Sequence, residues 1–379
     1  AAGVDVVSRS RWNNTLLVRG KDISKMMSLR SLPFVIGVKR VWTSPDSITS
    51  SGKRAAWHSD FYSWDTMPDD YGVCAEQIKS LKGDSLHSLG WKGNGKTIAV
   101  LDGGFMNVDK IPAFKKVRII GTHDFVVPPS KDVFKEIDHG TMVLSAMAIN
   151  EPNIYVGTAP EAAYWLLRCE DTRSESEAEE DYWAAAAEFA DSVGVDVINS
   201  SLGFHAFDDK STSHKYGELD GKTALISRTA SMLARKGIVL VNSAGNEGMG
   251  TWKKINFPAD ASDILTVGSI SPEGMNAAFS SVGPTADGRV KPDVMAYGSP
   301  TAVITGRGTI IRDMGTSFSA PLVSGLVACL WEALPKLTAT LIEDIVRRSA
   351  NNYPTPDNIF GYGVPDFMKA YQLGKDMTR

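Results

Sequence analysis

Cysteine is scarce in this 379-residue chain, and its three cysteines, Cys74, Cys169 and Cys329, lie far apart. That spacing excludes a disulfide framework and offers no paired thiolate ligands for a metal. Basic charge is not in excess either, because 40 Lys and Arg stand against 44 Asp and Glu, for a formal net charge of −4. We therefore expect no nucleic-acid partner.

Long apolar runs are also missing. No stretch reaches the roughly 18 apolar residues of a membrane-spanning helix, and the opening residues AAGVDVVSRS follow no signal peptide within this chain. We expect no membrane span. The 43% of hydrophobic residues is nevertheless enough to build one large domain with a small one attached.

The first 45 residues predict a small α+β segment. A strand is expected at 15–20 (TLLVRG), a helix at 23–32 with Asp22 as its N-cap, and a second strand at 34–42 (FVIGVKRVW). The composition then changes, which places the end of this segment near residue 45.

A Ser-, Asp- and Pro-rich stretch follows over 46–70, with scattered aromatic residues and little periodicity. Such a stretch is typical of a linker or an extended arm. We therefore predict a main domain over 71–379.

Apolar strands alternate with helical patterns along the main domain. The expected strands cover 97–102, 163–168, 195–203, 237–246 and 264–270. Continuous apolar strands separated by helices predict an α/β fold, in which helices cover both faces of a mostly parallel central sheet. Functional sites in such folds form at the carboxyl ends of the strands.

Two polar residues stand where a site could form. Asp102 ends the strand TIAVLD and is followed by two glycines, while His139 heads the apolar helical run HGTMVLSAMAI. Alone, the aspartate is more typical of a local turn and the histidine of ordinary packing. Gly140 beside His139 would allow another group to approach closely.

Two further candidates lie near the C-terminal half. Asn246 follows a strand in VNSAGNEG, and Ser317 opens the apolar stretch GTSFSAPLVSGLVACL. Thr316 or Ser317 could be the N-cap of a buried helix. That reading does not explain the small residues, since Gly325 inside a helix costs about 1 kcal/mol relative to Ala. Close packing is expected there.

The order Asp, His, Asn, Ser, each with its flanking residues, resembles the subtilisin-like serine proteases. The resemblance covers about residues 80–372. It is carried by TIAVLDGG, DHGTMV, VINSSLG, SAGNEG and GTSFSAPLVSG, and by AAFSSVGP with KPDVMAYG before the serine. The family has a three-layer fold, so the resemblance implies the same α/β architecture.

The resemblance also implies a role for each matched residue. Ser317 would attack the peptide carbonyl, His139 would take and return the proton, and Asp102 would orient His139. Asn246 and the backbone N–H of Ser317 would hold the oxyanion. No cofactor is required for this chemistry.

Substrate binding is implied for Ser201, Leu202, Gly203, Phe204 and Gly245. The backbone around Ser201 to Gly203, and the segment after WLLRC, would flank an extended peptide and pair with it as added strands.

Three positions depart from the family pattern. Phe204 stands where a glycine is usual, Phe318 where methionine is frequent, and Leu322 where histidine is common. Phe204 could narrow or cover the specificity pocket. None of the three removes a catalytic group.

Residues 14–42 look like the last part of a subtilase propeptide, which would make the N-terminal segment an intramolecular inhibitor; the alternative is an ordinary structural extension. Any cleavage is expected between Val41 and Tyr71. Family habit implies a secreted or cell-envelope protein.

Two weaker signals remain. The run EDTRSESEAEED at 170–181 is a solvated loop, or else an acidic rim that prefers basic peptides. Structural calcium often accompanies the family, but no D-x-D-x-D-G loop assigns its ligands.

The leading hypothesis is a serine endopeptidase that acts on extended polypeptides through an acyl-enzyme. The alternatives are a catalytically silent, peptide-binding protein of the same fold and an esterase or amidase with the same triad.

Overall fold

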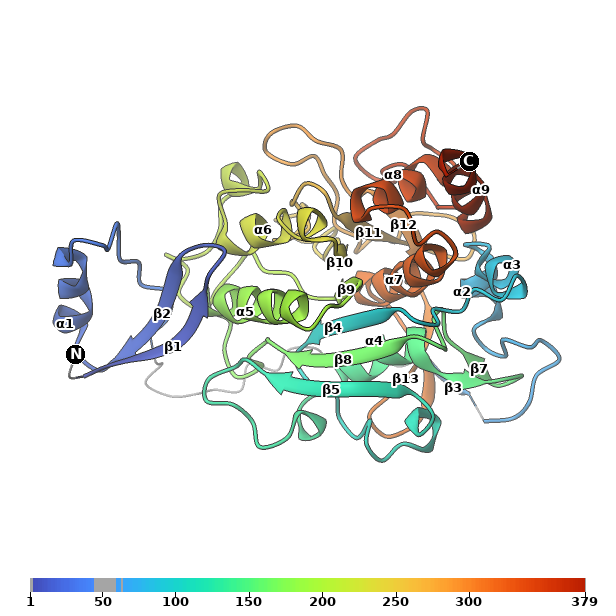
Figure 1. Ribbon diagram of the computed structural model, residues 1–379, viewed down its shortest axis with the longest axis horizontal. Coiled ribbons are helices and arrows are strands. Elements are labelled where there is room, and N and C mark those ends of the chain that lie inside the picture. Colours follow the sequence, from blue (N-terminus) through green and yellow to red (C-terminus); the bar gives the residue numbers. More distant parts are fainter. Residues whose placement is uncertain (1–2, 44–58, 63, 379) are drawn as a thin grey trace.

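The computed structural model describes residues 3–43, 59–62 and 64–378. Its centre is a seven-stranded sheet in the order β12-β11-β10-β9-β4-β8-β5, in which every pairing is parallel (Figure 1). The strands are β4 (Thr97–Asp102), β5 (Arg118–Asp124), β8 (Ala163–Arg168), β9 (Val197–Ser200), β10 (Val239–Ser243), β11 (Leu265–Ile270) and β12 (Val294–Tyr297). The predicted α/β fold with a mostly parallel sheet is confirmed.

Both faces of the sheet are buried, as the alternation within β4 shows. Ile98 and Val100 join one apolar cluster, whereas Ala99 and Leu101 join a second cluster on the opposite face. Successive side chains of a strand point to opposite faces. A strand covered on both sides must therefore be apolar throughout, which explains the continuous apolar runs in the sequence.

Helices supply the outer two layers. Helices α4 (His139–Ala148) and α7 (Thr316–Ala333) cover one face, and α5 (Ala178–Ser192) and α6 (Leu225–Ala230) cover the other. The remaining helices of the domain are α2 (Ala75–Lys79), α3 (Gly83–Ser88), α8 (Ala339–Ser349) and α9 (Phe367–Met377). None of the described helices combines the length and the apolar character needed to cross a bilayer.

Smaller elements complete the domain. An antiparallel sheet joins β13 (Thr301–Ile304), β14 (Ile310–Asp313) and β3 (Ser59–Tyr62), and β6 (Asn150–Glu151) pairs with β7 (Tyr155–Val156). The 3-10 turns are η1 (Leu29–Ser31), η2 (Pro112–Phe114), η3 (Val133–Lys135), η4 (Tyr216–Glu218) and η5 (Ala234–Lys236).

The N-terminal segment is a hairpin followed by a short helix. Strands β1 (Val4–Ser10) and β2 (Thr15–Gly20) pair antiparallel, and α1 (Ile23–Ser28) follows, with Asp22 accepting a hydrogen bond from the Lys25 N–H at 3.2 Å. The predicted strand at 15–20 and the Asp22 cap are thus confirmed. Strand β1 was not predicted.

The strand expected at 34–42 is wrong, because the structure assigns no strand within this range. A strand needs a neighbour to accept its backbone hydrogen bonds. Here neither the hairpin nor the main domain provides a strand that pairs with residues 34–42. The predicted linker at 46–70 lies largely outside the described residues, so the boundaries of the segments remain predictions.

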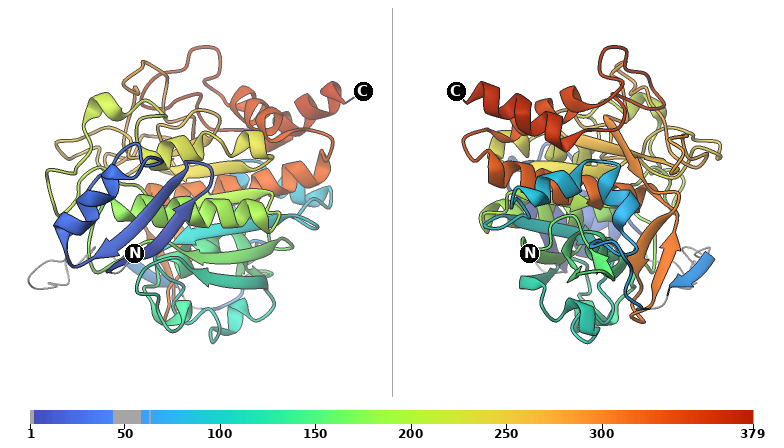
Figure 2. Two further views of the ribbon diagram at one scale, coloured as in Figure 1. Left: turned by 60° about the vertical axis from the view of Figure 1, so that its left-hand side comes forward. Right: turned by 90° about the vertical axis from the view of Figure 1, so that its right-hand side faces the viewer.

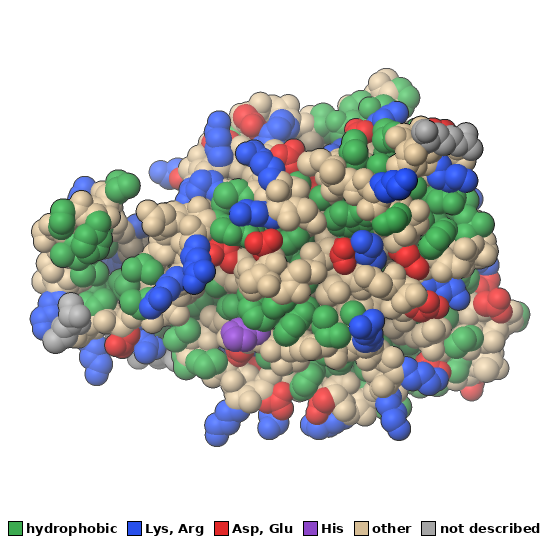
Figure 3. All heavy atoms as spheres, viewed as in Figure 1, with side chains coloured by type: hydrophobic (Ala, Val, Ile, Leu, Met, Phe, Trp, Pro, Cys, Tyr) green, Lys and Arg blue, Asp and Glu red, His purple; other side chains and the backbone are tan. Residues whose placement is uncertain are grey.

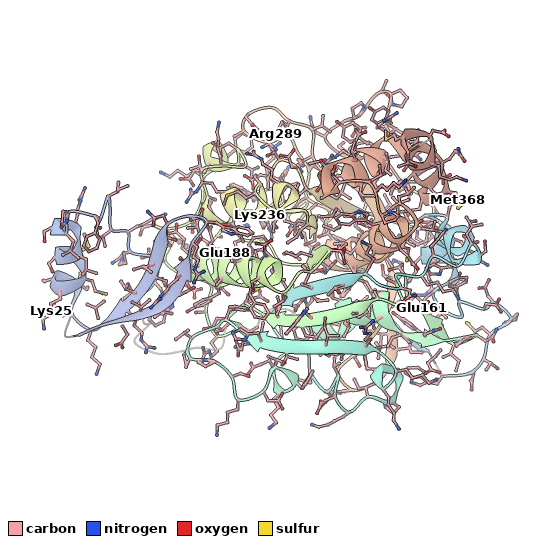
Figure 4. All side chains as sticks on the ribbon, viewed as in Figure 1. Lys25, Glu161, Glu188, Lys236, Arg289 and Met368 are labelled. Carbon is pink, nitrogen blue, oxygen red and sulfur yellow. The ribbon has the colours of Figure 1, made fainter. Side chains whose placement is uncertain are left out.

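The hairpin lies over α5 (Figure 2, left). Glu188 points from α5 toward it (Figure 4) and accepts hydrogen bonds from the Ser10 hydroxyl at 2.5 Å and from the Arg11 and Trp12 N–H groups at 2.9 and 3.2 Å. Lys236 stacks over the Trp12 ring at 5.0 Å. Only the turn of the hairpin is held in this way.

Beyond that turn the segment projects from the body of the molecule. Helix α1 buries no residue, and its Ile23 and Met27 are 59% and 44% exposed. Hydrophobic side chains accordingly gather at this end of the surface in Figure 3. The segment therefore packs on the domain through the hairpin, whose Trp12 and Leu17 join the apolar cluster beside α5, and through residues 39–41, but not through α1.

Candidate active site

Asp102 is the last residue of β4 and is fully buried. Its carboxylate oxygens lie 3.0 and 2.9 Å from Nδ1 of His139, and Oδ1 also accepts the Gly103 N–H at 2.8 Å. Burial raises the pKa of Asp102, although His139 and the Gly103 N–H oppose the rise. The carboxylate lies where it would stabilise an imidazolium formed on His139.

His139 begins α4, as the sequence predicts, and its side chain is 14% exposed. The helix behind it is buried from Gly140 to Ala148, so the backbone that carries the imidazole is held by packing. A Cβ at Gly140 would lie 2.4 Å from the Gly104 carbonyl oxygen. The glycine therefore lets α4 approach the end of β4, which brings His139 to Asp102.

Ser317 lies in the first turn of α7 and is 2% exposed. Its hydroxyl donates to the Ser201 carbonyl at 3.2 Å, and the Ser201 hydroxyl donates to the Ser317 carbonyl at 2.8 Å. The next residue, Phe318, places its ring centroid 5.9 Å from that of His139. The start of α7 thus meets both the end of β9 and the imidazole.

Asn246 contacts the same helix turn. Its Oδ1 accepts hydrogen bonds from the Thr316 N–H and hydroxyl, both at 2.9 Å. The Thr316 hydroxyl in turn accepts the Gly245 N–H at 3.1 Å. Since Oδ1 is taken by Thr316, Nδ2 is the side-chain atom of Asn246 that can donate to a reacting group.

The helix-cap reading of this stretch is wrong. The N-cap of α7 is Gly315, which makes no side-chain cap bond, and Thr316 and Ser317 turn their hydroxyls to Asn246 and Ser201, which follow β10 and β9. The close packing expected around Gly325 is present, since a Cβ there would lie 2.0 Å from Oγ1 of Thr158.

The proposed substrate walls lie beside these groups. A Cβ at Gly203 would meet Cβ of Asn256 at 2.8 Å, and one at Gly245 would meet Nδ2 of Asn256 at 2.9 Å. The Leu202 carbonyl accepts a hydrogen bond from Asn242 at 3.2 Å. The two glycine segments therefore face one buried asparagine.

Phe204 differs from the other predicted substrate residues. Its N–H and carbonyl already pair with Phe257, both at 2.9 Å, and the residue is 1% exposed. The Phe204 backbone is therefore engaged within the domain and does not extend the pairing predicted for Ser201 to Gly203. Whether its ring shapes the pocket stays a prediction.

Arg168 was missed in the sequence. It ends β8 opposite Asp102, is 2% exposed, and donates to the Gly103 carbonyl at 3.0 Å and to Asp124 at 3.0 and 3.1 Å. It holds the turn that follows Asp102. The signal was available, because a charged residue ends the apolar strand AYWLLR just as Asp102 ends TIAVLD.

Most of the chain matches the model of one known protein family. The model of the subtilase family matches residues 93–363, which is more than half of the chain. The chain belongs to the subtilase family. It therefore carries a subtilisin-like serine protease domain, and Asp102, His139, Asn246 and Ser317 all fall within the matched region.

Relatives and solved structures agree with this assignment. Subtilisin NAT of Bacillus subtilis subsp. natto is 30% identical over 288 residues, which cover 76% of this chain and 68% of the relative. The membrane-bound transcription factor site-1 protease of Rattus norvegicus is 28% identical over 308 residues. That match covers 78% of this chain but only 27% of the relative.

The fold is shared with MycP1 from the ESX-1 type VII secretion system. The TM-score is 0.63 at 21% identity, over 83% of this chain and 90% of that structure.

Among the described side chains of residues 3–43 and 64–378, no three of His, Cys, Asp or Glu come together as a metal centre would need.

Proposed function

We propose that this subtilase is a serine endopeptidase that hydrolyses peptide bonds of extended polypeptides through an acyl-enzyme. The observation that carries the proposal is the paired contact of the Asp102 carboxylate with Nδ1 of His139, next to the first turn of α7, which carries Ser317. A protein that only binds peptides needs no such constellation.

In the first step the Ser317 hydroxyl turns from the Ser201 carbonyl to His139. Nε2 of His139 takes the hydroxyl proton while Oγ bonds to the substrate carbonyl carbon. Asp102 keeps Nδ1–H in place and stabilises the imidazolium. The carbonyl oxygen becomes an oxyanion, which Asn246 Nδ2 and the Ser317 N–H would stabilise from the start of α7.

The tetrahedral intermediate then collapses, and its C–N bond breaks as His139 returns the proton to the leaving amine. In the second half, His139 deprotonates a water that attacks the acyl carbon. The ester bond to Ser317 breaks, the acid leaves, and the serine recovers its proton. The nucleophile, base and donors all come from the chain, so we propose that no cofactor takes part in the chemistry. A structural calcium remains part of the proposal without assigned ligands.

Substrate would lie along Ser201 to Gly203 and beside Gly245 as an added strand. We also propose that the N-terminal segment acts as an intramolecular inhibitor, which its docking on α5 supports. A secreted or cell-envelope location is proposed from the family, and the shared fold with a protease of a secretion system supports it.

A fluorophosphonate probe, with the adduct mapped by mass spectrometry, tests the nucleophile. We expect label on Ser317, and Ser317→Ala should lower the kcat of peptide hydrolysis by roughly 10⁶-fold. Ser319→Ala is the matched control, because this serine lies two residues along the same buried helix turn. It should keep both label and activity.

The outcomes separate the alternatives. Label on Ser317 with ester but no peptide hydrolysis would point to an esterase or amidase. Absence of label, or full peptidase activity in Ser317→Ala, would leave a peptide-binding protein of subtilase fold.

A further inference from the structure

A pocket opens between the loop that follows β8 and the loop that follows β9. Its walls are formed by Ser174, Glu175 and Ser176 on one side and by Asp208, Asp209 and Thr212 on the other. The Asp208 N–H donates to the Glu175 carbonyl at 2.9 Å, which ties the two walls together. Acidic side chains are thus presented from both loops.

The pocket lies at the edge of the sheet that carries the proposed triad. In the sheet, β4 with Asp102 lies between β8 and β9. The wall that contains Asp208 begins at Ser201, whose carbonyl receives the Ser317 hydroxyl. The arrows of β5 and β8 point to this end in Figure 1. The pocket is therefore formed by the loops that follow β8 and β9, the two strands on either side of β4.

Residues 39–43 of the same chain lie at the rim of this pocket. Lys39 pairs with Glu177, Arg40 pairs with Asp209 at 2.9 Å, and residues 41–43 complete the lining. Val41 packs against the apolar cluster of this face of the sheet. Two adjacent basic residues thus pair with two carboxylates, Glu177, which follows the first wall in the chain, and Asp209 of the second wall.

Glu177 is the carboxylate that most requires a basic partner. It is 7% exposed, and its Oε2 is buried without a hydrogen-bond partner among the described residues. Burial, followed by the charges of Glu180 and Glu177, raises the pKa of the nearby Asp181 to about 7. A cation beside Glu177 therefore stabilises its ionised form, as Lys39 does here against the effect of burial.

Asp209 differs from Glu177 because its side chain is exposed to solvent. Ser211 donates to its Oδ1 from its N–H at 3.0 Å and from its hydroxyl at 2.6 Å, and these bonds lower the pKa of Asp209. The carboxylate is therefore charged and held in position near neutral pH. Its pair with Arg40 is exposed, and exposed ion pairs are weak. Most of the selectivity should come from Glu177.

We propose that this pocket binds a pair of adjacent basic residues in an extended polypeptide substrate, several residues away from the bond that is cut. In this chain, Lys39 and Arg40 occupy the position that the basic pair of a substrate would take. The inference rests on the proposed peptidase function, since it takes the pocket as part of the substrate path.

Binding can be measured apart from catalysis in a Ser317→Ala background. The probes are two fluorescein-labelled peptides, FVIGVKRVWT, which copies residues 34–43, and FVIGVQQVWT. With Lys39→Ala and Arg40→Ala added to vacate the carboxylates, we expect anisotropy to show at least ten-fold tighter binding of the Lys-Arg peptide. With Lys39 and Arg40 intact, its binding should be weaker by a similar factor.

Glu177→Gln with Asp209→Asn, added to the same background, should remove the preference while preserving side-chain shape. Asp5→Asn is the matched control, because Asp5 is an exposed carboxylate of the hairpin, 3.9 Å from Arg19. Melting temperatures confirm that each variant is folded.

Equal affinity for the two peptides, or a preference that survives Glu177→Gln and Asp209→Asn, would overturn the inference. Neither result depends on catalysis. Failure of the peptidase proposal shows instead as an unlabelled Ser317.

Discussion

The two polar side-chain atoms of Asn246, Oδ1 and Nδ2, have different roles. Its Oδ1 fastens the first turn of α7 by two hydrogen bonds from Thr316, which directs Nδ2 to the place where we expect the oxyanion. An Asn→Ala change would remove both functions at once, so it cannot separate structure from catalysis. An acidic side chain of the same shape can do so.

Asn246→Asp keeps an acceptor for Thr316 but loses the N–H donor. We expect the melting temperature to change little and kcat to fall by about 10²–10³-fold, the size found when such a donor is removed from subtilisin. KM should stay close to that of the wild type, because the donor acts mainly in the transition state. Steady-state kinetics with a peptide substrate provides the measurement.

Thr316→Val serves as the converse control, since it removes the hydroxyl bond to Asn246 and leaves Nδ2 in place. It should weaken stability more than kcat. A kcat of Asn246→Asp within three-fold of the wild type would show that Nδ2 does not contact the oxyanion.

For single residues, the sequence predicts a functional role where the neighbouring residues in the chain form a distinctive pattern. Asp102 and His139 were found because a strand ends at one and a helix begins at the other, and the structure brings them into contact. Arg168 was missed although it ends an apolar strand as Asp102 does, whereas Thr316 was missed as a functional residue because its partner Asn246 lies 70 residues away. Spacing along the chain carries no trace of such contacts.

Elements of the sheet were predictable because burial on both faces demands unbroken apolar strands. The expected strands at 97–102 and 163–168 coincide with β4 and β8. The segment at 34–42 shows the limit of this reasoning. Its apolar, β-branched composition is typical of a strand, but the fold supplies no neighbour, and it forms ion pairs through Lys39 and Arg40 instead.

The N-terminal hairpin, residues 4–20, is attached to α5 through Glu188. Glu188→Ala removes the acceptor of three hydrogen bonds from Ser10, Arg11 and Trp12, and bonds to a charged group contribute about 1.5–3 kcal/mol each. We expect amide exchange in residues 4–20 to become at least about ten-fold faster, with little change in the exchange of β4. Hydrogen–deuterium exchange with peptide mass spectrometry measures both regions in one experiment.

Asp191→Ala, on the same helix, is the control and should leave the exchange of the hairpin unchanged. Protection of residues 4–20 that is the same in Glu188→Ala and in the wild type would mean that other contacts hold the hairpin.

The stability of the whole molecule should depend on pH through a buried carboxyl on α8. Glu343 is 1% exposed, its Oε1 has no hydrogen-bond partner among the described residues, and Arg347 lies 3.6 Å from its other oxygen. Arg347 is itself engaged by Asp293 at 2.8 Å. Burial raises the pKa of Glu343 from 4.5 to about 8, although the charge of Arg347 opposes the rise.

The sign of the pH effect follows from this difference. Between pH 4.5 and 8 the unfolded chain has released the proton of Glu343 and the folded chain still holds it. The free energy of unfolding therefore falls as pH rises through this window. One pKa unit corresponds to 1.36 kcal/mol, so the loss reaches roughly 3 kcal/mol by pH 7.

Glu343→Gln has no proton to release, so it should flatten this dependence. In a Ser317→Ala background, which prevents self-digestion, we expect the variant to match the parent near pH 4.5 and to be more stable by a few kcal/mol at pH 8. Urea unfolding followed by tryptophan fluorescence at several pH values measures the difference. Asp344→Asn removes a half-exposed carboxylate that pairs with Arg348, and it should shift stability by less than about 1 kcal/mol. Parallel curves for Glu343→Gln and its parent would mean that Glu343 is already ionised in the folded protein.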